Sequence, residues 1–244
     1  MRRFPPAYMT TADQTRPEIR YRWDDWDDEE RPLDDEFKAR LVPLSCRAVV
    51  AFTIAIGEWI VHRFSALSDD PAPLQYLESS WLQVIDWGYG RDWEDLQHYD
   101  DWRGPVRAPL WDAMERIMYA VREADGLGDG SLMCGWNDGL ARLVLPDPEP
   151  YIAWRDAALA FLEEHHLRTS DDPLGEILLP DHFDPPRVLP DAEVERAGSD
   201  LLHFAKHARN PFLKGEAELR VDEDFEGQPY VFDLKKDRQR RADW

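Results

Sequence analysis

The segment from Leu44 to Leu67 constrains the fold of this chain more than any other. Apolar side chains cover most of the circumference that this segment would have as a helix. A helix that is apolar nearly all round packs against neighbours on several sides. We therefore expect it to be the central helix of a helical protein. One stripe of that helix carries its less apolar residues: Arg47, Ala51, Glu58 and His62. The uncharged part of the segment is too short to span a bilayer, so no membrane contact is expected.

Helical periodicity and helix-boundary residues predict further helices on both sides of this segment. They cover residues 34–42, 73–88, 106–124, 151–167 and 191–209. Three segments between them look different: residues 126–139 are rich in glycine and predict a mobile connector, residues 140–145 fit either a short helix or a short strand, and the proline-rich residues 168–189 predict a long loop.

The C-terminal part of the chain shows another pattern. Residues 217–221 and 230–234 alternate in the manner of strands around an acidic turn, which predicts a β-hairpin. The expected fold is mainly α: a single-domain, irregular helical bundle of about six to seven helices with a small C-terminal β-hairpin. Residues 1–22 are expected to form an extended N-terminal arm, residues 23–234 the helical domain, and residues 235–244 a basic tail that folds back or stays solvated.

The charge of the chain limits the partners that it can have. Acidic residues outnumber basic ones 50 to 29, which gives a formal net charge of −21. Such a charge repels nucleic acid and anionic lipid, and it attracts cationic partners. A GC-rich genome or adaptation to salt would also produce an excess of acid. Two cysteines, Cys46 and Cys134, stand far apart, which favours reduced, buried thiols, and the N-terminus lacks the apolar core of a signal peptide. We expect a cytoplasmic protein.

The residue types that carry chemistry do not form a known catalytic or cofactor motif. Gly126, Gly128 and Gly130 lack the lysine of a phosphate loop. His203 and His207 lie four apart, as on one helical face, but no glutamate follows His203 as in zinc proteases. We therefore assign no catalytic residue, no metal site and no cofactor.

Two segments combine tryptophans with dense carboxylates, and they are the candidate partner-binding residues. The first segment comprises Trp23, Asp24, Asp25, Trp26, Asp27, Asp28, Glu29 and Glu30. The second comprises Asp92, Trp93, Glu94, Asp95, Asp100, Asp101 and Trp102. Exposed tryptophan is costly in water and is enriched at binding hot spots, and carboxylates around it would orient a basic partner. The competing interpretation is that the indole rings turn into the core and the acids form a solvated rim.

These properties favour an acidic, protein-binding inhibitor that occludes a cationic partner, such as a toxin or a nuclease domain. Immunity proteins that neutralise a cognate bacterial toxin have the same physical properties, so an immunity protein is the preferred hypothesis. The alternative is an enzyme of unfamiliar type, a hydrolase or a metal-dependent enzyme. Its site would lie near the loop 168–189, where His182 stands close to Asp181 and Asp184.

Overall fold

The computed structural model describes residues 9, 16–23, 33–223, 225 and 227–242 of the chain. The α-helices are α1 (Asp35–Leu41), α2 (Cys46–Phe64), α3 (Ala72–Gln83), α4 (Trp93–Leu96), α5 (Gly104–Asp125), α6 (Ser131–Val144), α7 (Glu149–His165), α8 (Asp191–His207), α9 (Glu216–Leu219) and α10 (Leu234–Ala242). The short 3-10 helices η3 (Trp87–Tyr89), η4 (Tyr99–Asp101) and η5 (Pro180–His182) lie in the described connections between them. The predicted mainly helical fold is confirmed. None of the described helices is long and apolar enough to cross a membrane.

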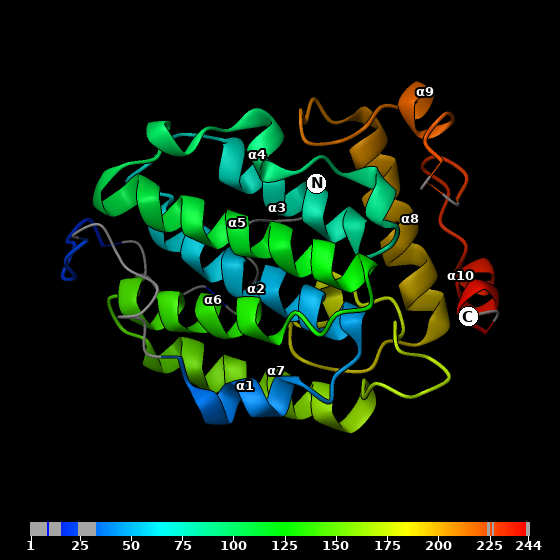
Figure 1. Ribbon diagram of the computed structural model, residues 1–244, viewed down its shortest axis with the longest axis horizontal. Helices are drawn as coiled ribbons and strands as arrows, with labels where there is room; N and C mark the ends of the chain where they lie inside the picture. Colours follow the sequence, from blue (N-terminus) through cyan, green and yellow to red (C-terminus); the bar gives the residue numbers. More distant parts are fainter. Residues whose placement is uncertain (1–8, 10–15, 24–32, 224, 226, 243–244) are drawn as a thin grey trace.

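Helix α2 is the centre of the molecule, as its sequence predicts. Every one of its 19 residues is buried, and α3, α5, α6 and α7 pack around it (Figure 1). Gly57 lets α5 approach closely, because a Cβ atom at this position would lie 2.6 Å from Ile117 Cδ1. The main apolar core of the protein is built on this helix.

The two arginines of α2 have hydrogen-bond partners inside the protein, since every residue of this helix is buried. Arg63 donates to the backbone carbonyls of Val144 and Glu18, at 2.9 and 2.8 Å, and also to that of Arg16. Arg63 thereby fastens the N-terminal segment 16–18 to the central helix. Unpaired burial of a guanidinium would cost far more than these hydrogen bonds contribute.

The second buried arginine of α2 fastens the C-terminal helix. Arg47 forms an ion pair of 2.8 Å with Asp237 of α10, and both side chains are almost fully buried. Asp237 also accepts a hydrogen bond of 3.2 Å from Arg241, which pairs in turn with Asp172. Burial lowers the pKa of Arg47, and the charge of Asp237 acts in the opposite direction. The described part of the basic segment 235–244 is therefore a helix docked on the acidic body.

The predicted β-hairpin is wrong, since residues 217–221 and 230–234 form no strands in the structure. The first segment lies mostly in α9, where Glu218 reaches back to accept a hydrogen bond of 2.8 Å from the backbone N–H of Gly215. The second segment leads into α10, whose first turn is capped by Asp233 accepting from Lys236 N at 3.0 Å. Local side-chain caps of this kind compete with strand pairing and stabilise helical turns.

The glycine-rich connector is also shorter than predicted, because α6 begins at Ser131. Gly130 adopts a left-handed conformation just before the helix, and Asp129 accepts a hydrogen bond from Ser131 N. Gly135, inside α6, allows close packing, since a Cβ atom there would lie 2.9 Å from Leu33 Cδ1. Gly135 therefore marks a close contact rather than a mobile connector.

The ion pair between Arg47 and Asp237 gives a first prediction. Asp237→Asn removes a buried negative charge and leaves three arginines, Arg47, Arg240 and Arg241, beside a neutral amide, so the unfolding free energy should fall by about 3–5 kcal/mol. The matched control is Asp191→Asn, which breaks the exposed pair of Asp191 with Arg238 and should leave the stability nearly unchanged. Urea denaturation of both variants measures the difference, and equal stabilities would contradict the role given to Asp237.

Candidate functional site

The first acid–tryptophan segment lies almost entirely outside the described residues, which include only its first member. Trp23 is half-buried and packs against the main core, with its ring edge-on to Tyr21 at 6.4 Å. The hydroxyl of Tyr21 donates to the carbonyl of Pro105. Trp23 therefore belongs to a stretch of chain that is anchored close to the end of the second segment. Asp24, Asp25, Trp26, Asp27, Asp28, Glu29 and Glu30 lie outside the described residues.

In the second segment, the expectation of exposed indole rings is wrong. Trp93 and Trp102 are 0% and 1% exposed, and their ring centroids lie 5.1 Å apart. Trp93 also stacks on Phe212 at 5.4 Å. The short helices α4 and η4 turn both rings inward onto α5, because a buried indole removes a large apolar area from water. These two tryptophans are core residues.

The same short helices leave the carboxylates outside, and they expose two other apolar side chains. Leu96 and Tyr99 are 39% and 58% exposed. We call the exposed residues of this region the Tyr99 surface: Glu94, Asp95, Leu96, His98, Tyr99, Asp100 and Asp101. Its apolar anchors are thus a tyrosine and a leucine instead of the predicted tryptophans. Tyr99 is held from behind by the ring of Trp111, at 5.8 Å.

Internal ion pairs use part of the negative charge of this surface. Arg122 of α5 pairs with Asp92 at 2.6 Å and with Glu94 at 3.8 Å, and Arg103 pairs with Asp100. Asp95 and Asp101 are exposed and form no ion pair with any residue in the part of the chain that the structure describes. Two carboxylates beside Tyr99 are therefore available to a cation from outside.

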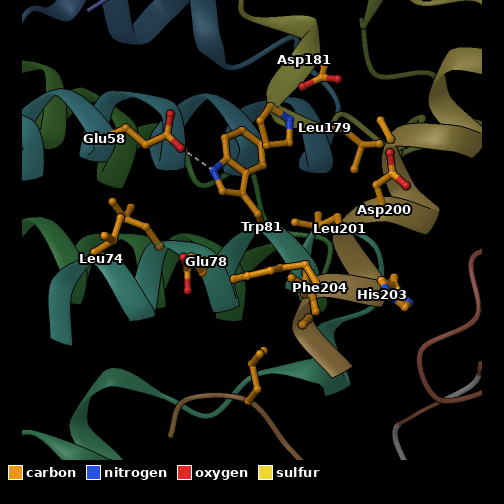
Figure 2. Close-up of a pocket in the computed structure, with 16 residues that line it drawn as sticks. Glu58, Leu74, Glu78, Trp81, Leu179, Asp181, Asp200, Leu201, His203 and Phe204 are labelled. Carbon is orange, nitrogen blue, oxygen red and sulfur yellow. Dashed lines mark hydrogen bonds between the residues drawn. The ribbon is translucent and has the colours of Figure 1, made fainter. Parts of the chain in front are cut away.

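A second candidate site is a cavity of about 470 Å³, where α2, α3 and α8 meet the proline-rich loop (Figure 2). Its walls are mainly apolar: Leu74, Leu77, Trp81, Leu82, Leu179, Pro180, Ala197, Leu201, Phe204, Ala205 and Leu213. The cavity lies where the main core and a smaller apolar cluster around α8 meet, and Leu201 packs against both. The alternative enzyme site predicted from the sequence lies in the same region, near the loop 168–189, but the cavity itself was not predicted.

The polar groups of the cavity are almost all acidic. Glu58, Glu78, Asp181 and Asp200 line it together with His203. Glu58 is 3% exposed, and its Oε1 accepts a hydrogen bond of 2.8 Å from Trp81 Nε1. Burial raises the pKa of Glu78, whose carboxylate also accepts from Asn210 Nδ2 at 3.4 Å. The cavity therefore combines apolar walls with negative groups.

The residues of the catalytic alternative do not meet in this cavity. His182 is buried and does not line it, and its Nδ1 accepts a hydrogen bond of 2.9 Å from Leu179 N. Asp181 does line the cavity and is exposed. The two thiols are buried, and burial raises the pKa of Cys134 to about 12, which disfavours a thiolate nucleophile.

The other histidines divide between the surface and the interior. His203 and His207 do share one face of α8, with ring centroids 5.0 Å apart. Within the described residues, no group of three or more metal-ligating side chains assembles. His166 and His182 are buried with their rings 6.4 Å apart, and burial lowers the pKa of each from 6.5 to about 4.

The buried histidine pair gives a prediction about acid stability. As the pH falls from 6.5 to about 4, the unfolded chain binds more protons than the folded chain, so the unfolding free energy falls, by about 3 kcal/mol for each ring. His182→Asn keeps an acceptor for Leu179 N and cannot be protonated, so its stability should decline less steeply in this window. Urea denaturation at a series of pH values tests this, with the exposed His203→Asn as control. Parallel curves for wild type and His182→Asn would contradict it.

No protein-family model matches the chain. No curated protein and no solved structure matches it either.

Proposed function

We propose that this protein works by binding a basic protein partner through the Tyr99 surface. The observation that carries the proposal is the exposure of Tyr99 and Leu96 between carboxylates, two of which, Asp95 and Asp101, have no cationic partner in the described structure. Tyrosine is enriched at protein interfaces because it contributes a large contact area and a hydroxyl at a low cost in conformational entropy. Such an anchor suits a partner with an apolar pocket rimmed by lysine or arginine.

The charge of the whole chain supports a cationic partner. A net charge of −21 creates a field that draws a basic protein in and raises the association rate, particularly at low salt. The exposed carboxylates next to Tyr99 would then fix the orientation of the complex. The acidic residues 24–30 lie outside the described residues, so the proposal rests on the Tyr99 surface alone.

The form of binding that fits best is inhibition by occlusion. A carboxylate-rich surface can cover the basic working surface of a toxin or nuclease domain without any chemistry of its own, as immunity proteins do. This interpretation needs neither a catalytic residue nor a cofactor. It requires one-to-one binding that weakens as salt rises, because the interacting charges are screened.

The test compares two variants as baits. In the first, Asp95→Asn, Tyr99→Ala and Asp101→Asn remove the anchor and both available charges. In the control, Glu36→Gln on α1 and Glu164→Gln on α7 remove two exposed charges from the side of the molecule away from α4 (Figure 1). Each bait is exposed to an extract of the source cells at low and high salt, and retained proteins are identified by mass spectrometry.

The expected result is one basic protein that wild type and control retain at low salt and that the Tyr99-surface variant loses. With this partner purified, calorimetry should give one-to-one binding that the surface variant weakens by about 30-fold or more, the loss typical of a hot spot. Equal binding by the surface variant and the wild type, or a partner that is itself acidic, would refute the proposal.

A further inference from the structure

We infer that the cavity between α2, α3, α8 and the proline-rich loop binds an organic cation, specifically a primary ammonium at the end of an apolar chain. This chemistry occurs in free alkylamines and in the side chain of lysine. The inference concerns a site on other elements than the Tyr99 surface and does not depend on the proposed function.

The first argument is the charge of the lining. Four acidic residues line the cavity, and no lysine or arginine is among the described residues that line it. Elsewhere in the protein, arginines form ion pairs with acidic side chains, as Arg47 does with Asp237 and Arg122 does with Asp92. An ammonium group that enters the cavity would meet negative groups on several sides, whereas an anion would be repelled.

The second argument is the position of Glu58. This carboxylate is almost fully buried, and the hydrogen bond from Trp81 holds it in place on the wall of the cavity (Figure 2). A buried carboxylate gains most from a charge-assisted hydrogen bond, because few water molecules compete with the ligand. Glu58 is therefore the group that we expect to contact the ammonium.

The third argument is the apolar part of the cavity. Leu74, Leu201 and Phe204 are only half-buried, and all three line the cavity. A ligand with an alkyl chain would remove this apolar surface from water, which is favourable in proportion to the area covered. A volume of about 470 Å³ lies within the range of small-molecule sites.

The electrostatics of Glu78 agree with this assignment. Burial raises the pKa of its carboxyl group, so the surroundings of Glu78 disfavour its charged form. A cation bound nearby would favour that form and would be held by it. Asp181 and Asp200, which are both exposed, would attract the ligand at the rim.

The experiment measures binding of n-hexylammonium by isothermal titration calorimetry and by NMR. Hexanol and hexanoate serve as the neutral and anionic counterparts with the same chain, and Nα-acetyl-lysine methylamide represents the lysine source. The amine should bind in a saturable way and at least about tenfold more tightly than hexanol, the difference expected for one charge-assisted hydrogen bond. Hexanoate should not bind. Tighter binding of the lysine derivative than of the alkylamine would identify a lysine side chain as the source of the ammonium group. Tighter binding of the alkylamine would identify a free amine.

Two variants locate the site. Glu58→Gln keeps the acceptor for Trp81 and removes the charge, so it should weaken amine binding about tenfold and leave hexanol binding unchanged. Ala197→Phe places a ring in the cavity from α8, at a position that is not fully buried. This variant should abolish binding of both hexylammonium and hexanol. It tests the location of the site independently, so the test stands even if Glu58→Gln does not fold. Glu164→Gln, far from the cavity on α7, is the control and should bind like wild type. Equal affinity for amine and alcohol, or amine binding that survives Ala197→Phe, would overturn the inference.

Discussion

The structure depends on the complete burial of α2. A helix without a solvent-facing stripe requires neighbours on all sides, and α3, α5, α6 and α7 supply them. It also requires that each charged residue on it find its partner inside the protein. Arg63 and Arg47 meet this requirement by capturing residues 16–18 and Asp237, which come from opposite ends of the described chain. The central helix thus organises the core and also fixes the segments that are farthest from it in sequence.

Much of the helical fold could be predicted, because long amphipathic segments carry a strong periodic signal. The segments 34–42, 44–67, 106–124, 151–167 and 191–209 each correspond to a helix with slightly different ends. The failures occur where the signal is short. The five-residue alternation at 217–221 is equally compatible with the single helical turn of α9, and the side chain of Glu218 selects the turn. The prediction for residues 126–139 failed for another reason: Gly135, one of the glycines that predict mobility, instead lets Leu33 come close to α6.

The candidate sites could be predicted less well. The sequence identified residues 92–102 as unusual, but it did not reveal which aromatic side chains face water. That choice depends on α4 and η4 packing against α5, which places Trp93 and Trp102 in the core and leaves Tyr99 outside. The cavity could not be predicted for the same reason, since its lining comes from five separate parts of the chain. Composition did indicate the property that both sites share, an excess of carboxylate over cation.

Helix α8 lies between the cavity and the C-terminal helix α10. Its cavity side presents Leu201 and Phe204, while α10 packs against it and joins it through the pair of Arg238 with Asp191 and a hydrogen bond from Leu234 N to Glu195. A molecule that occupies the cavity would therefore resist any displacement of α8, and with it the release of α10. By thermodynamic linkage, a state in which the C-terminal helix has detached would hold the same molecule less tightly. The C-terminal helix, although it does not line the cavity, would in this way set how firmly the cavity holds its contents.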